Sequence, residues 1–169
     1  MFWSTYKIDK AVNGVHVGKT DLKTGQIIQD VVVDVPAEAT NTKSMYCASG
    51  QTKDHYIPIS MTSKAYLDVF TKKDLKLVQR FFLEGTDAAI STPYKFYHGN
   101  TNNAMDKLLI TVNEADKDHG KTNGKVHLVE LDANALVDGK IKVLNRGVIA
   151  GTPKSITFRA YYSPDDSKI

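Results

Sequence analysis

The chain has 169 residues, of which 41% are hydrophobic and 24% are charged. This is the size and composition of one ordinary globular domain, and it excludes a disordered tail and a membrane protein. The 22 basic and 19 acidic residues give a net charge of +3 and are mixed along the chain, so the sequence predicts no nucleic-acid partner. No apolar run approaches the ~18 residues of a membrane span, and the first residues lack the pattern of a secretory signal.

Cysteine usage and short motifs exclude several further classes of site. Cys47 is the single cysteine, which excludes an intramolecular disulfide framework, a zinc knuckle and a Cys-x-x-Cys-His haem attachment. The sequence also lacks the glycine-rich fingerprints of dinucleotide and P-loop sites, the zinc-protease helix motif and the hydrolase nucleophile elbow. A single cysteine does not indicate whether the protein works in an oxidising or a reducing compartment.

In chain order, the first predicted element is a hairpin built from residues 15–21 and 25–28. Its pattern is an apolar alternating segment, a turn opened by Asp or Thr, and a second apolar segment that follows Gly-Gln, Leu-Lys or Gly-Lys. The pattern recurs at 66–71 with 75–78, and at 126–132 with 139–143. The turn positions Asp21, Thr71 and Asp132 are 50 and 61 residues apart, which indicates an internal repeat with loops of unequal length.

A second set of segments repeats with the same spacing. Residues 45–47, 96–98 and 157–159 each lead through a polar turn toward the next segment, which is an apolar strand at 56–61 and 108–112. Cys47 and His98 are 51 residues apart, and His98 and Arg159 are 61 apart. The repeating unit is therefore four strands long, and four short antiparallel strands per ~40–60 residues are typical of a β-propeller blade.

We therefore predict an all-β fold, namely one segment, 1–169, of an incomplete β-propeller with four-stranded antiparallel blades. Residues 1–36 form a partial blade, 43–85 and 94–148 form two whole blades, and 155–169 begin the next. Because both ends fall inside a blade, we expect the chain to be a fragment of a longer protein.

A competing interpretation applies to residues 63–83, where Tyr66, Val69 and Phe70 fall partly at helical spacing. The repeat-equivalent windows favour strands, because 27–35 is rich in β-branched residues and 139–143 alternates strictly. A repeat is not expected to be a helix once and a strand twice, so we predict strands here.

The order of these elements resembles the YVTN-type propeller repeat. Residues 161–166, Tyr-Tyr-Ser-Pro-Asp-Asp, resemble the turn after the first strand of that repeat, and residues 16–26 resemble its third strand and the following Thr-Gly-Lys-like turn. Pro93 and Pro153 stand where the family often places a proline before the first strand. The resemblance covers nearly the whole chain, with departures in the loop 113–124 and the insertion 133–138.

The resemblance implies a location and a range of functions. Many YVTN-type propellers are exported bacterial proteins, which implies a periplasmic or otherwise exported location. Relatives include the haem-bearing propeller of cytochrome nitrite reductases and propellers attached to other redox enzymes. A shared fold does not by itself transfer an activity.

Candidate site residues follow from the predicted first strands, which line the central channel of a propeller. Cys47, His98 and Arg159 share one repeat position, and Tyr46 and Tyr97 stand beside the first two. A thiol, an imidazole and a guanidinium facing one channel could bind a haem propionate, a small anion or a transition metal, for which His98 and Cys47 are the candidate ligands. The structural alternative is that Cys47 fills a small buried space and His98 caps a turn.

Two functions remain open. The first is a binding or scaffold module that presents loops and a central channel to a protein partner or a redox cofactor. The second is a redox enzyme, nitrite-reductase-like, with haem or a metal at the channel mouth. The expected partners are the remaining blades of the parent propeller and a redox protein.

Overall fold

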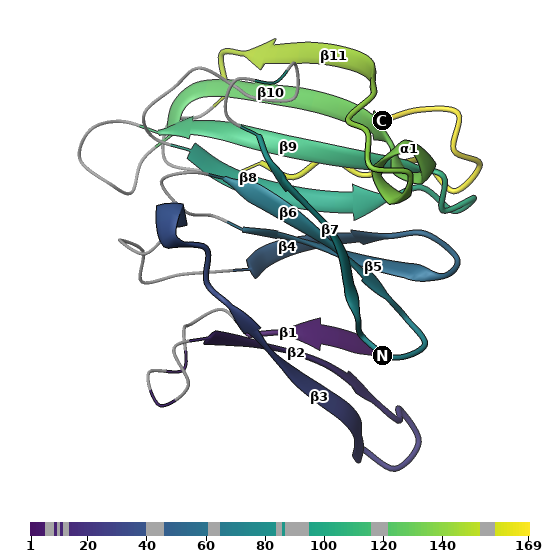
Figure 1. The fold of residues 1–169 in the computed structure, drawn as a ribbon. Helices are drawn as coiled ribbons and strands as arrows, with labels where there is room; N and C mark the ends of the chain where they lie inside the picture. The colour runs from purple at the N-terminus through teal and green to yellow at the C-terminus, as the bar shows by residue number, and fades with distance from the viewer. Residues whose placement is uncertain are drawn as a thin grey trace.

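The computed structural model describes residues 1–5, 9, 11, 14–39, 46–60, 65–83, 86, 95–115, 122–152 and 158–169. In these residues, three antiparallel sheets lie on one another as layers (Figure 1). The predicted all-β fold class is confirmed.

Each sheet follows the chain, so that consecutive strands are hydrogen-bonded neighbours. The first sheet contains β1 (Phe2–Ser4), β2 (Gly14–Thr20) and β3 (Ile27–Asp34). The second contains β4 (Tyr46–Gln51), β5 (His55–Ser60), β6 (Tyr66–Thr71) and β7 (Leu77–Phe82). The third contains β8 (Lys95–Thr101), β9 (Lys107–Ala115), β10 (Thr122–Asp132) and β11 (Val143–Ala150). A 3-10 turn, η1 (Ala37–Ala39), follows β3, and a short helix, α1 (Ala133–Val137), follows β10.

The packing of strand β6 accounts for a sequence pattern that fits both a helix and a strand. Tyr66 and Phe70 pack into the core between the first and second sheets, whereas Leu67 and Val69 pack into the core between the second and third. Because the second sheet is covered on both faces, β6 is apolar on both faces and loses the simple alternation of a half-buried strand. The predicted strands at 63–83 are confirmed as β6 and β7.

The hairpin turns show the predicted repeat in their backbone. In all three, the residue that opens the turn donates its N–H across the turn, from Asp21 to Gln26 O, from Thr71 to Lys76 O and from Asp132 to Lys142 O. The aligned positions Gly25, Leu75 and Gly139 all adopt the left-handed conformation, with φ of 72°, 54° and 78°.

The third hairpin differs from the prediction at its second strand. The sequence predicts a strand at 139–143, but β11 begins only at Val143, because the insertion 133–138 forms α1. The helix is capped by the Asp132 carboxylate, which accepts the N–H groups of Asn134 and Ala135. At its other end, Gly139 N donates to Leu136 O and Lys140 N to Ala135 O, which is a Schellman motif that needs the left-handed glycine.

The C-terminal segment repeats a turn rather than a strand in the described residues. Ser163 N donates to Lys168 O and Asp166 N to Ser163 O, as Asn102 N does to Lys107 O and Met105 N to Asn102 O in the third sheet. Asp166 and Met105 also share a positive φ, 58° and 59°. Residues 158–162, within the predicted start of the next blade, carry no strand.

The exact blade boundaries at 36, 43, 85, 94, 148 and 155 stay a prediction, because most of them lie at or beside residues outside the described ranges. Among the residues that the structure describes, no helix is long and apolar enough to span a membrane.

Candidate functional site

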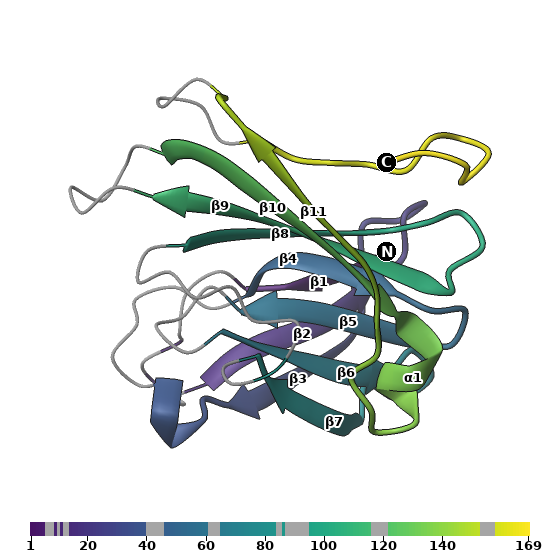
Figure 2. The same cartoon turned by 90° about the horizontal axis from the view of Figure 1, so that it is seen from above.

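The predicted site lies along β4 and β8, the first strands of the second and third sheets, which contact each other across the layers (Figure 2). Glycines allow this approach. A Cβ on Gly50 would lie 2.3 Å from Leu108 Cδ1, and a Cβ on Gly99 would lie 2.6 Å from Ile59 Cδ1. The outermost strands β3 and β7 lie on the far side of the molecule from β8.

Tyr46 points into the core between the first and second sheets. Its hydroxyl donates a hydrogen bond to Oδ2 of Asp68, whose carboxylate is fully buried. The same carboxylate accepts hydrogen bonds from Nε and Nη2 of Arg80, both at 2.7 Å. Burial, and then the charge of Asp68, raise the pKa of Tyr46 well above its ordinary value. The hydroxyl of Tyr46 is thus committed to the Asp68–Arg80 pair.

The positive charge of Arg159 acts on the imidazole of His98. Burial lowers the pKa of His98 to about 4, and the positive charge of Arg159 contributes to this shift. The imidazole is therefore neutral near pH 7. Its Nε2 is buried and has no hydrogen-bond partner in the described structure.

The third sheet holds the segment that carries Arg159. Asn113 bonds the backbone of Phe158 twice, accepting from its N–H and donating to its carbonyl, both at 2.8 Å. Ala160 N donates to Thr111 Oγ1 at 3.2 Å. Because these bonds fix the residues on both sides of Arg159, the backbone at Arg159 is held beside β9.

Cys47 and Tyr97 lie on β4 and β8, but their side chains lie outside the described structure. A metal site built on His98 and Cys47 therefore stays a prediction. Among the described side chains, no group of three or more His, Cys, Asp or Glu residues is placed to hold a metal ion.

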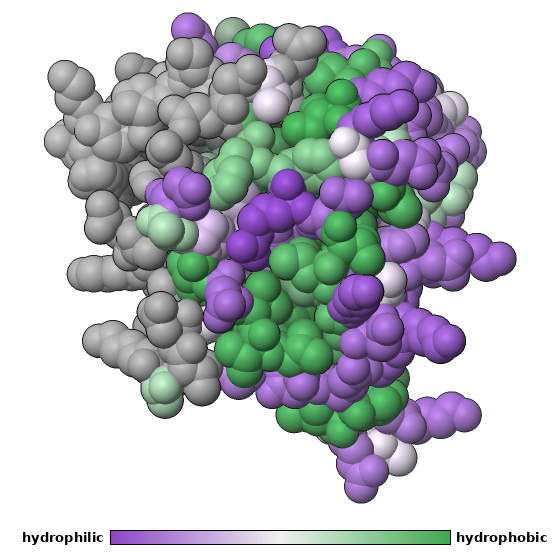
Figure 3. Space-filling view, viewed as in Figure 1, coloured by the Kyte–Doolittle hydropathy of each residue, from purple (hydrophilic) through white to green (hydrophobic). Residues whose placement is uncertain are grey.

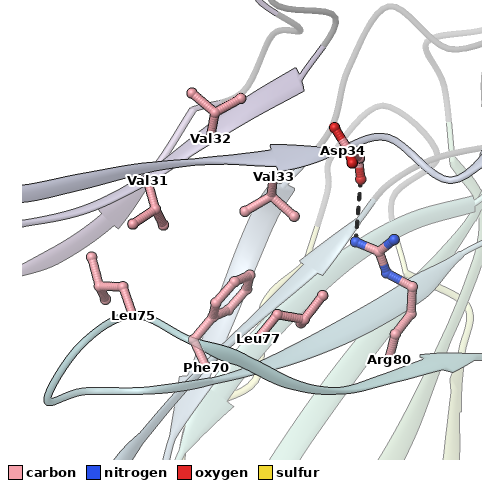
Figure 4. A pocket seen from close by; sticks show the side chains of 8 residues that line it. All are labelled: Val31, Val32, Val33, Asp34, Phe70, Leu75, Leu77 and Arg80. Carbon is pink, nitrogen blue, oxygen red and sulfur yellow. Dashed lines mark hydrogen bonds between the residues drawn. The ribbon is translucent and has the colours of Figure 1, made fainter.

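A groove of about 320 Å³, which the sequence did not indicate, lies between β3 and the β6–β7 hairpin (Figure 4). Val31 and Val33 point into it from β3, while Val32 points away. The opposite wall is formed by side chains of the second sheet, namely Phe70, Leu75, Leu77 and Arg80. Asp34, at the end of β3, also lines the groove.

Arg80 closes one end of this groove. Its Nη2 donates to the backbone carbonyl of Asp34 at 3.4 Å, in addition to its bonds with Asp68. Its guanidinium lies over the Tyr66 ring, 5.0 Å from the centroid. Burial lowers the pKa of Arg80, but the hydrogen bonds and charge of Asp68, together with Tyr46 and Tyr66, outweigh it and raise the pKa above its ordinary value. The charge of Arg80 is largely balanced by the buried Asp68 carboxylate.

His16, which the sequence analysis did not select, lies on the outward face of the first sheet. Its Nδ1 is 2.9 Å from Asp30 Oδ2, and its Nε2 is 3.2 Å from Asp9 Oδ2. Hydrogen bonds to Asp30 and then to Asp9 raise the pKa of His16. The alternation of β2, with Val15 and Val17 in the core, is the signal that places His16 on the opposite face.

Comparisons with known proteins give the fold alone. No model of a protein family matches the chain, and no curated protein matches it. Among solved structures, the chain is similar to one described as "Structure of Dos1 propeller", with a TM-score of 0.57 and 14% sequence identity. The match covers 98% of this chain and 37% of that one, so the chain spans well under half of the propeller it resembles. The three sheets are therefore the blades of an incomplete β-propeller.

Proposed function

We propose that the chain is a binding or scaffold module of a larger β-propeller, which presents its loops and channel mouth to a protein partner. The observation that carries the proposal is the outward face of the first blade, the sheet β1–β3. The inward-facing Val15, Val17 and Val33 are buried against the second blade, yet Val32 on the outward face is 47% exposed. Stacked blades bury such faces against each other, and this supports a further blade as the neighbour of β1–β3.

The YVTN-type repeat and the exported location belong to the same proposal. The repeat is supported by the left-handed positions and cross-turn hydrogen bonds that recur at the aligned residues. The exported location follows from the resemblance to that family alone. The remaining blades of the parent propeller are the expected first partner of this chain.

The test is the association state of residues 1–169 expressed alone, measured by size-exclusion chromatography with light scattering. We expect self-association or poor solubility, and we expect Val32→Lys to reduce it because the charge lies on the open face. Leu22→Lys is the matched control, since Leu22 is 74% exposed in the β2–β3 turn and lies outside this face. A monomer with a clean cooperative melt would overturn the proposal.

A second candidate, the redox propeller, is favoured by one observation. The imidazole of His98 is neutral and its buried Nε2 lacks a partner in the described structure, which is the state of a histidine that ligates a metal. We propose His98 as the residue that would hold such a group, with a redox protein as partner. The test is visible absorption and metal analysis of the whole gene product. Haem or stoichiometric metal that is lost in His98→Ala would support this function, and a colourless, metal-free protein would contradict it.

A further inference from the structure

The groove between β3 and β7 lies between the outermost strands of two neighbouring blades, away from the predicted channel site. Figure 3 shows apolar residues gathered over this region, with hydrophilic residues around them. Besides the groove walls, both strands expose large apolar side chains: Ile27 and Ile28 are each 62% exposed, and Leu77 and Val78 are 36% and 37% exposed. An apolar surface that follows two strands is a common feature of protein docking sites.

In the described structure, the strands on the two sides of the groove, β3 and β7, are edge strands of their sheets. Among the strands that the structure describes, β3 pairs with β2 alone, and β7 pairs with β6 alone. An edge strand keeps one row of N–H and C=O groups for a further strand, so an extended peptide can bond to it while its alternate side chains enter a pocket. The run 31–33 of β3, three valines, keeps this wall in the extended conformation that such pairing needs.

Leu75 shapes the floor of the groove. It occupies the turn position at which the other two repeats have glycine, and it adopts a left-handed φ of 54°. Its side chain is 2% exposed and lines the groove. The side chain of Leu75 thus supplies apolar surface to the groove at a position where glycine would leave a cavity.

The charges at the two ends of the groove differ in sign. The adjacent turns at one end, residues 19–26 and 71–76, contain five lysines and two aspartates. The turns are held together by Lys19 Nζ, which donates to Lys73 O at 2.6 Å, and by Gln29 Nε2, which donates to Asp74 O at 2.7 Å. At the other end Asp34 is exposed, and Arg80 is neutralised by Asp68. This charge pattern is complementary to a segment with an acidic end and a basic end.

We propose that the groove between β3 and β7 is a docking site for an extended segment of a partner protein. The segment places alternate apolar side chains in the groove, an acidic residue toward the lysine-rich turns and a basic residue toward Asp34. This site goes beyond the proposed scaffold role, and it does not require a further blade on the first sheet.

The test is a selection from a phage-displayed library of random peptides against the whole gene product. We expect the enriched peptides to share an alternating apolar centre flanked by opposite charges. Synthetic copies should bind Leu77→Lys at least tenfold more weakly, since the charge enters the groove from an exposed position. Asp34→Lys should weaken the binding of peptides with a basic end.

Val148→Lys is the matched control, because Val148 is a 60% exposed apolar residue on β11, outside the groove. It should leave peptide binding unchanged. No enrichment, or enriched peptides that bind Leu77→Lys as tightly as the unaltered protein, would overturn the proposal. A dimer that Leu77→Lys dissociates would assign the groove to a second copy of the chain, and would also overturn it.

Discussion

At the scale of single residues, Tyr46, Asp68 and Arg80 form one hydrogen-bonded group around a buried charge. Asp68 is fully buried, and a buried carboxylate is tolerated only when it is paired and hydrogen-bonded. Arg80 supplies two parallel donors and the charge, while Tyr46 supplies a third donor. The pair thus ties β6 to β7, and the hydroxyl ties both to β4.

The first prediction compares how much the Asp68 charge and the Tyr46 hydroxyl each contribute to the free energy of unfolding. Asp68→Ala should lower the free energy of unfolding by about 3 kcal/mol, because Arg80 is then partly buried without its counter-charge. Tyr46→Phe should cost only about 1–2 kcal/mol, because Asp68 keeps both bonds from Arg80. Urea titration of the two variants measures the difference. Equal losses would contradict a network centred on the Asp68 charge.

The second prediction concerns pH and His98. Its pKa in the fold is about 4, below the ordinary 6.5, so the folded state binds fewer protons than the unfolded state between these values. The contribution is fully present above pH 6.5 and is lost as pH falls toward 4. His98→Gln should therefore reduce the loss of stability on acidification, measured by urea titration across this range.

His16 provides the control of opposite sign for this measurement. Its pKa is raised, so its contribution is fully present below the ordinary pKa and is lost as pH rises through the raised value. His16→Gln should change stability on the alkaline side of the range, where His98 is already neutral. If His98→Gln lost as much stability on acidification as the unaltered protein, the result would contradict a neutral, buried His98.

At the scale of elements, the hairpin turns show how one backbone can carry different residues. Gly25, Leu75 and Gly139 share the left-handed conformation, which glycine adopts freely and a residue with a Cβ adopts at a cost of roughly 1–2 kcal/mol. Leu75 is kept there by its side chain, which is buried between the first and second blades.

The third prediction uses this conflict between backbone and side chain. Leu75→Ala and Leu75→Gly both remove the buried side chain, which should cost about 2–5 kcal/mol. The alanine variant retains the left-handed strain, whereas the glycine variant releases it. Leu75→Gly should therefore be more stable than Leu75→Ala by about 1 kcal/mol, the reverse of the order in a regular strand. Thermal unfolding of both variants is the measurement, and the ordinary order would contradict it.

The elements were predictable where periodicity and turn chemistry agreed. The strands β2, β6 and β10 follow from alternation or from equivalence to an alternating repeat, and the turn positions follow from the residues that open the turns and from their spacing. The alternation of 139–143 predicts a strand, but the cap at Asp132 and the glycine at 139 enclose a helix whose five residues are too few for a periodic signal.

At the scale of the whole molecule, sequence spacing predicted neighbouring blades but not their surfaces. As the repeat predicts, β4 and β8 each begin a four-stranded sheet. The channel site built on Cys47, His98 and Arg159 stays a prediction. The spacing did not indicate that Tyr46 turns to Asp68, because a strand residue's face depends on a register that spacing does not fix. The groove between β3 and β7 arises only when two blades stack, so no single repeat shows it.

The last prediction tests the stacking itself. A Cβ at Gly99 would lie 2.6 Å from Ile59 Cδ1 and 3.3 Å from Ser49 O, so Gly99→Ala should push the second and third blades apart. We expect a loss of about 1–3 kcal/mol, as for other overpacked cores. Gly147→Ala is the control, because its Cβ would meet only Leu128 Cβ at 4.0 Å, and it should change stability by less than about 0.5 kcal/mol. Hydrogen exchange should show the β4 and β8 amides less protected in Gly99→Ala alone. Equal effects of the two substitutions would contradict a close approach of the blades along β4 and β8.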